Sequence, residues 1–174
     1  MAEVESSLAD IYEQHATLLS FLSESNVPAP PALALTARFA INAGLRRALE
    51  ADNYDAAEVT RLLRRADMDN VTLDTSMISY AADKRMRRAM VRLENVVENQ
   101  TLSVLNETLA IAESLRTLPM EVNLWQAQNI WNDLLRRSER TYWTREWREG
   151  FRKIGEALNI AVDDLVTEEG VAAF

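Results

Sequence analysis

The chain contains no cysteine, and only four glycines and four prolines occur among its 174 residues. The absence of cysteine excludes a disulfide-stabilised scaffold and every metal site built on thiolates. Without cysteine, the single histidine, His15, cannot form a structural zinc site. Because glycine and proline mark most turns, their scarcity favours a few long helices over a sheet of many strands.

The sequence also lacks a long apolar run and an excess of positive charge. No segment approaches the about 18 consecutive apolar residues that a transmembrane helix needs. The acidic start, Met1–Glu5, is unlike a secretory signal, so we expect a cytoplasmic protein. A formal net charge of −8 at pH 7 argues against a nucleic-acid partner. We therefore expect neither a membrane nor a nucleic acid among its partners.

The common catalytic and metal-binding motifs are missing. There is no glycine-rich phosphate loop and no Gly-x-Ser-x-Gly turn that would expose a nucleophilic serine. Asp67–Asn70 is similar to the start of a calcium loop, but Thr72 stands where that loop needs glycine and Ile78 where it needs glutamate. The sequence therefore predicts no catalytic residue, no metal site and no cofactor. Carboxylates are abundant, so their number alone leaves a catalytic pair open.

Helical periodicity runs along almost the whole chain. Apolar residues recur at the i, i+3, i+4 spacing that is typical of amphipathic helices. Pro31 fits the first turn of a helix, and Asp55 with Glu58 resembles a capping box at the start of another. Asp74 or Thr75 is a suitable cap for the next helix. These patterns predict an all-α fold, a bundle of about six to seven mostly antiparallel helices.

We expect this bundle to form one domain over residues 1–158, followed by an acidic, loosely ordered tail over residues 159–174. His15 falls on the apolar stripe of the first helix, where we interpret it as a partly buried, hydrogen-bonded residue. Lys84, Arg88 and Arg92 share one helix face by their i, i+4 spacing. In an acidic protein this face is expected to be solvated or paired with a neighbouring acidic helix.

The most unusual segment, residues 119–132, carries amides and indoles where a helix normally carries charges. No residue from Val122 to Asn132 is charged. Amides donate and accept hydrogen bonds and indole offers a flat apolar surface, so such a face suits a second protein domain or a sugar. Packing inside the core is the third alternative. The candidate contact residues are Glu121, Asn123, Trp125, Gln126, Gln128, Asn129 and Asn132.

A helical wheel shows which of these residues are expected to share one face. It places Trp125 on one face with Val122, Asn129 and Asn132, about 100° from Leu124 in the core stripe.

Three stretches of the sequence resemble one family. Leu118–Asn129 resembles a signature near the C-terminal end of glycoside hydrolase family 57-like bacterial proteins of the α-amylase/α-mannosidase type. Ile11–Leu19 and Phe39–Glu50 fit the same family in order and spacing. The resemblance covers about residues 5–137 and concerns the family's C-terminal helical region, a domain of unknown function.

This resemblance implies an upstream β/α barrel that holds the family's catalytic carboxylates, so no catalytic role transfers to a residue of this chain. It also implies a helical domain that packs on the barrel and helps to wall the substrate cleft. We therefore expect a non-catalytic accessory domain whose partners are that barrel and an α-glucan. The alternative is a free-standing helical interaction module that forms a homodimer, and a complete small enzyme is the third hypothesis.

Overall fold

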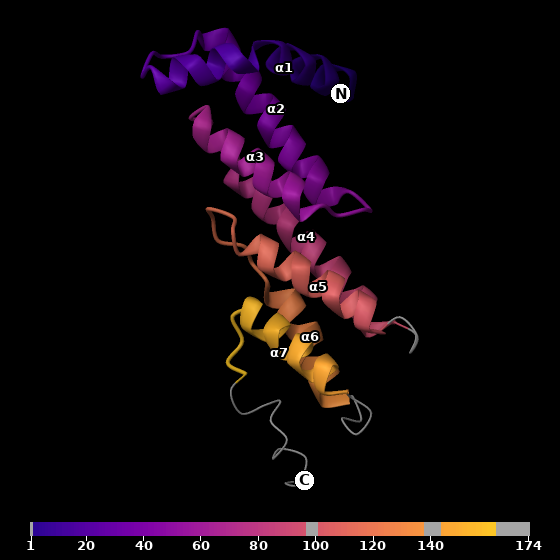
Figure 1. Ribbon diagram of the computed structural model, residues 1–174. Coiled ribbons are helices and arrows are strands. Elements are labelled where there is room, and N and C mark those ends of the chain that lie inside the picture. Colours follow the sequence, from indigo (N-terminus) through magenta and orange to yellow (C-terminus); the bar gives the residue numbers. More distant parts are fainter. Residues whose placement is uncertain (1, 97–100, 138–143, 163–174) are drawn as a thin grey trace. The chain divides into compact units, whose positions relative to one another are not determined.

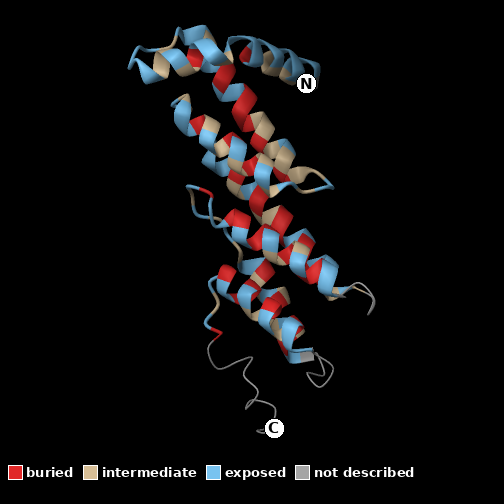
Figure 2. Cartoon of the chain, in the orientation of Figure 1, coloured by how far each residue is buried: buried red, intermediate tan, exposed pale blue. Residues whose placement is uncertain are grey.

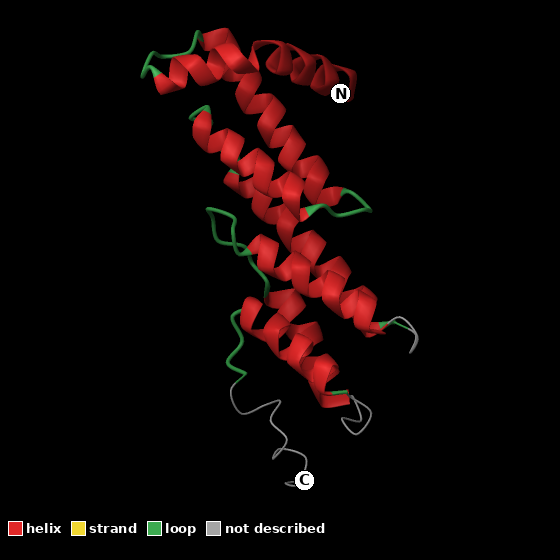
Figure 3. Cartoon of the chain, viewed as in Figure 1, coloured by secondary structure: helices red, strands yellow, loops and turns green. Residues whose placement is uncertain are grey.

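The computed structural model describes residues 2–96, 101–137 and 144–162, and within them it confirms the all-α prediction. Seven helices and no strand form the regular structure of these residues (Figures 1 and 3). The helices are α1 (Ala2–Glu24), α2 (Pro31–Glu50), α3 (Ala56–Met68), α4 (Thr75–Glu94), α5 (Thr101–Leu115), α6 (Trp125–Arg137) and α7 (Arg145–Ala157). None of the described helices is long and apolar enough to cross a membrane.

The chain divides into two compact units, Met1–Ala81 and Ala82–Phe174, and helix α4 runs through the boundary. The single bundle over residues 1–158 stays a prediction. Most of the predicted acidic tail, residues 163–174, lies outside the described residues. Val162, at the beginning of that tail, is buried.

Several helix starts follow the sequence closely. Pro31 is the first residue of α2, where its missing N–H costs nothing. Asp55 caps α3 by accepting a hydrogen bond from the Ala57 N–H at 2.8 Å. Asp74 caps α4 by accepting one from the Met77 N–H at 3.0 Å. Short polar side chains thus satisfy donors that the first helical turn leaves unpaired.

Three helices end on an asparagine with positive φ, a backbone conformation that glycine usually supplies. In each case the N–H after the asparagine reaches back five residues to a carbonyl of the last turn, which closes a Schellman motif. The φ values are 52° at Asn26, 50° at Asn70 and 60° at Asn159. The bonds are Val27 to Leu22 at 2.8 Å, Val71 to Ala66 at 2.8 Å and Ile160 to Gly155 at 2.9 Å.

In the first unit, α2 packs against both α1 and α3 and carries fully buried apolar residues along its length (Figure 2). Leu45 and Leu49 are inaccessible to solvent. The buried Asn42 donates to the Thr72 carbonyl at 3.1 Å and accepts from the Asp74 N–H at 2.6 Å, which ties α2 to the loop before α4. A buried amide with both ends bonded specifies one register of α2 against that loop.

The buried stripe of α1 is narrower than its sequence pattern predicts. Tyr12 and Leu19 are buried, whereas Ile11 and Leu18 are exposed. His15 is also exposed, so its interpretation as a partly buried residue was wrong. The physical reason is that the buried face of α1 is a narrow stripe that contains Tyr12 and Leu19, and His15 lies beside this stripe on the exposed surface.

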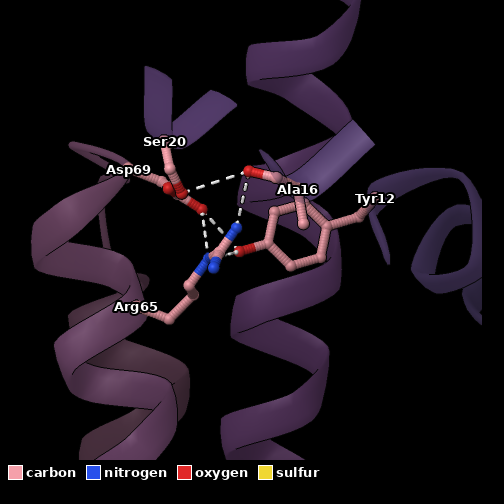
Figure 4. Close-up of polar contacts among 5 residues, drawn as sticks. All are labelled: Tyr12, Ala16, Ser20, Arg65 and Asp69. Atoms are coloured by element: carbon pink, nitrogen blue, oxygen red, sulfur yellow. Dashed lines mark hydrogen bonds and ion pairs between the residues drawn. The ribbon is translucent and has the colours of Figure 1, made fainter. Parts of the chain in front are cut away.

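A polar network joins α1 to the end of α3 (Figure 4). The Tyr12 hydroxyl donates to Asp69 Oδ2 at 2.5 Å, and Arg65 Nε donates to the Tyr12 hydroxyl at 2.7 Å and to Asp69 Oδ2 at 2.8 Å. Arg65 Nη2 donates to the Ala16 carbonyl at 2.8 Å. Burial raises the pKa of the Tyr12 hydroxyl, and the hydrogen bond to Asp69 raises it further. Burial disfavours the charge on Arg65, but its bonds with Asp69 and Tyr12 leave its pKa raised.

In the second unit an aromatic stack joins α6 to α7. The ring centroids of Trp131 and Phe151 lie 4.7 Å apart, and those of Trp147 and Phe151 lie 4.9 Å apart. Trp131 Nε1 donates to the Phe151 carbonyl at 2.9 Å. The stack of Trp131 on Phe151 and this hydrogen bond hold α6 in one rotation about its axis, and the second stack lies within α7.

The basic face of α4 is used in part as predicted. Arg92 forms an ion pair with Glu107 on α5, at 2.8 Å between Nη1 and Oε2. Arg85, in the same basic run, is buried, which its sequence context did not predict.

Candidate functional site

Trp125 is the first residue of α6 and its side chain is 64% exposed. The opposite face of the helix is buried, with Ala127, Trp131 and Leu135 in the core of the second unit. Burial at these positions sets the rotation of α6 and therefore directs the position of Trp125 outward. An indole on this outer face is exposed because the core requires the other face.

The seven candidate contact residues divide into two groups. Glu121, Asn123, Trp125, Gln126 and Asn129 are exposed, whereas Gln128 and Asn132 are half-buried. Core packing is therefore excluded for the five exposed side chains within their unit. We call the four uncharged members of this group, Asn123, Trp125, Gln126 and Asn129, the Trp125 surface.

Two of the predicted contact residues have structural roles instead. Gln128 Nε2 donates to the Leu158 carbonyl at 2.8 Å, which ties α6 to the end of α7. Asn132 Nδ2 donates to the Gln128 carbonyl at 2.9 Å, within its own helix. The Trp125 surface is therefore smaller than the sequence predicted.

The start of α6 differs from the helical wheel drawn on the sequence. Residues 119–124 form a loop, so Val122 does not share a helix face with Trp125. Asn123 Oδ1 accepts a hydrogen bond from the Trp125 N–H at 3.1 Å, and the Leu124 carbonyl accepts the first intrahelical bond, from Gln128. Capping by the Asn123 side chain is the local reason that the helix begins here. Asn123 consequently lies just ahead of the indole in the chain.

Charge returns only in the second half of α6. Trp125 and Asn129 are one helical turn apart, and the exposed Asp133 follows one turn later. Arg136 is exposed near the end of the same helix. The uncharged area is thus confined to the N-terminal half of α6 and residues 122–124 of the loop that precedes it.

A hollow of about 440 Å³ lies beside this loop. Its lining includes Glu121 and Val122 from the loop, Arg116 from the end of α5, and Asn159 from the turn after α7. The sequence placed Glu121 among the contact residues but gave no signal for Arg116 or Asn159, because they lie on other elements. The lining of this hollow combines a positive charge, a negative charge and an amide with apolar side chains.

The chemistry available at the Trp125 surface is that of binding. An exposed indole can stack on a flat partner, and amides can donate and accept hydrogen bonds with the same side chain. Among the described residues there is no group of three histidines, aspartates or glutamates that could hold a metal ion. Comparisons with protein families, with curated proteins and with solved structures find no match.

Proposed function

We propose that this chain is a non-catalytic helical binding domain that docks on a second protein domain through the Trp125 surface. The observation that carries the proposal is the 64% exposure of Trp125 on a helix whose opposite face is fixed by core packing. Tryptophan is one of the residue types enriched among side chains that dominate binding energy, and charges are depleted at the centres of interfaces. The uncharged half of α6 fits both rules.

The resemblance to family 57-like proteins makes a β/α barrel of the α-glucan hydrolase or transferase type the expected partner. In that arrangement the domain walls the substrate cleft and adds no catalytic residue. The support for the barrel as partner is the resemblance of residues 118–129, which contain every member of the Trp125 surface. A cytoplasmic location is part of the same proposal.

An α-glucan is the second candidate partner, favoured by one specific feature. Trp125 lies beside amides that can both donate to and accept from sugar hydroxyls, with Asn123 just ahead and Asn129 one turn on. The apolar face of a glucose ring stacks well on an indole. The alternative without a sugar or a barrel is a homodimer formed through the same uncharged face.

Replacement of Trp125 by alanine tests the proposal. We expect binding of a separately produced family 57-like barrel, measured by titration calorimetry, to weaken by about 30-fold or more, the loss typical of a central indole. Tyr80→Ala is the matched control, because Tyr80 is equally exposed at 66% but lies on α4. Asn129→Lys places a charge in the centre of the surface and is expected to weaken binding as well.

Three outcomes separate the alternatives. Heat with the barrel that is lost in Trp125→Ala supports docking. Heat with maltoheptaose that is lost in the same variant supports a glucan contact instead, and dimerisation in sedimentation equilibrium that disappears in Trp125→Ala supports the homodimer. No binding and no self-association in all three experiments would refute a functional role for the Trp125 surface.

A further inference from the structure

Helix α1 is exposed along most of its length and carries more apolar surface than the core of its unit uses (Figure 2). Tyr12 and Leu19 fill its buried side. On the other side, Val4, Ile11 and Leu18 are 60%, 41% and 45% exposed. Single exposed apolar residues are common, but these three lie on one helix at a constant interval of seven positions. We call them the α1 stripe.

The spacing of the α1 stripe indicates the shape of a partner. Seven residues of an α-helix rise about 10.5 Å and make almost two turns, so the three side chains form a line about 21 Å long. A second helix with apolar residues at the same seven-residue interval follows this line over its whole length. A small molecule covers only part of the line, and a β-strand, which repeats its side chains about every 7 Å, loses register with it.

The charges beside the α1 stripe are negative. Helix α1 contains acidic residues but neither lysine nor arginine. Glu3 and Asp10 directly precede the first two residues of the stripe, so these exposed carboxylates follow one of its edges, where paired helices usually exchange ion pairs. Neither forms an ion pair with another described residue. Glu5, by contrast, is half-buried and paired with Arg46 at 2.9 Å, within the first unit.

This charge disfavours two other occupants of the stripe. A second copy of α1 brings the same carboxylates, so self-pairing places like charges together and gains no interhelical ion pair. An anionic lipid surface repels the same edge. The complementary occupant is a helix whose apolar line is flanked by lysine or arginine.

We propose that the α1 stripe docks a basic amphipathic helix of another protein. The apolar line of that helix lies against Val4, Ile11 and Leu18, and its cationic side chains lie opposite Glu3 and Asp10. Burial of the apolar line supplies most of the affinity, and the ion pairs set the orientation of the partner. This contact lies on the first unit and is a different one from the Trp125 surface.

The test uses the full chain and two synthetic helical peptides of three seven-residue repeats each. Both peptides carry leucine at the first and fourth positions of every repeat. The remaining positions are lysine and alanine in one peptide, and glutamate and alanine in the other. Fluorescence anisotropy of the labelled peptides at physiological ionic strength measures binding. We expect saturable one-to-one binding of the lysine peptide and no binding of the glutamate peptide.

A substitution in the stripe separates docking from general attraction to an acidic protein. Ile11→Gln removes the centre of the stripe without changing the net charge. It should weaken binding of the lysine peptide at least about tenfold, as expected for one aliphatic side chain that becomes buried. Val91→Gln is the matched control, because Val91 is 43% exposed on α4, and it should bind like the unmodified chain.

A second pair of variants tests the charged edge. Asp10→Asn should weaken binding of the lysine peptide about twofold or more, as expected for an exposed ion pair. Asp52→Asn removes the same charge from an exposed position outside the helices and should leave the affinity unchanged. Trp125→Ala should also leave it unchanged, so this test can fail without any bearing on the Trp125 surface.

The proposal is overturned if the lysine peptide does not bind, if the two peptides bind equally, or if Ile11→Gln and Val91→Gln bind with equal affinity. Sedimentation equilibrium without peptide and co-sedimentation with phosphatidylcholine vesicles test the other occupants. Self-association or vesicle binding that is lost in Ile11→Gln would replace the basic helix by a second copy or by a lipid surface.

Discussion

Tyr12 shows how one hydroxyl can hold two elements together. It donates to Asp69 and accepts from Arg65, so α1 is fixed to α3 through a network that is mostly shielded from water. Arg65 and Asp69 are one helical turn apart, a spacing that a sequence reveals, but Tyr12 and Asp69 are separated by 57 positions. No periodicity connects Tyr12 to this pair, and therefore its part in the network could not be predicted from the sequence.

Removal of this hydroxyl should destabilise the first unit. We expect Tyr12→Phe to lower the free energy of unfolding by about 1–2 kcal/mol, because it leaves Asp69 and Arg65 without a shared partner. Urea denaturation followed by circular dichroism measures the change. Tyr80→Phe, at an exposed position on α4, is the control and should be neutral. Equal stability of the two variants would contradict a structural role for the network.

The same hydroxyl makes stability depend on alkaline pH. The pKa of Tyr12 is raised in the folded state, by burial first and then by Asp69, above its ordinary value of 10.0. The contribution of the neutral hydroxyl is complete below pH 10 and is lost as the pH rises, because the unfolded chain releases this proton first. We expect a decline of at most roughly 1.4 kcal/mol per pH unit above this point. The decline should be shallower in Tyr12→Phe, so the two chains should converge in stability.

Two helical glycines give a matched comparison of packing. A Cβ at Gly155 would lie 2.7 Å from Val162 Cγ1 and 2.8 Å from Trp131 Cζ2, whereas one at Gly44 would lie 3.3 Å from a Leu62 methyl carbon. We expect Gly155→Ala to destabilise by about 1–3 kcal/mol, because the ring of Trp131 is fixed by its stack with Phe151. Gly44→Ala should stay within about 0.5 kcal/mol, since better helix propensity offsets a small shift of Leu62. Thermal unfolding distinguishes the two results.

At the scale of elements, the sequence predicts which segments are helical better than it predicts where each helix begins and ends. Asp55 and Asp74 act as caps as predicted, because an N-cap depends on a short polar side chain and its immediate neighbours. The helical wheel includes Val122, whereas α6 begins at Trp125 and Asn123 caps it from the preceding loop. The predicted contact residue Gln128 instead donates a hydrogen bond to the Leu158 carbonyl. Leu158 lies 30 positions away, so a local sequence pattern does not reveal this bond.

The asparagine at the end of α3 gives a test at this scale. Asn70 has a φ of 50°, so Asn70→Ala should cost up to about 1 kcal/mol, because alanine lacks the short polar side chain that lets asparagine tolerate the left-handed region. Asn70→Gly should be neutral within a few tenths of a kcal/mol. Urea midpoints of the two variants measure the difference. Asn106→Ala, at an exposed position inside α5, is the control and should be neutral or stabilising because alanine favours helices.

At the scale of the whole molecule, two spectroscopic signals distinguish the unfolding of the two units. All four tryptophans lie between residues 125 and 147, within the second unit, whereas both units contribute helix. We expect Tyr12→Phe to shift the urea midpoint seen by circular dichroism more than the midpoint seen by tryptophan fluorescence. Coincident shifts of both signals would show that the units unfold as one cooperative body.

The asparagine-terminated helices also bear on the chemical lifetime of the protein. Asparagine deamidates when the backbone nitrogen of the next residue attacks its side-chain carbonyl carbon. In all three Schellman motifs that nitrogen is held by a hydrogen bond to a carbonyl of the preceding turn, and it belongs to Val27, Val71 or Ile160. The branched side chains at these positions hinder the attack further. The same geometry that ends each helix is therefore expected to slow deamidation of its asparagine for as long as the chain stays folded.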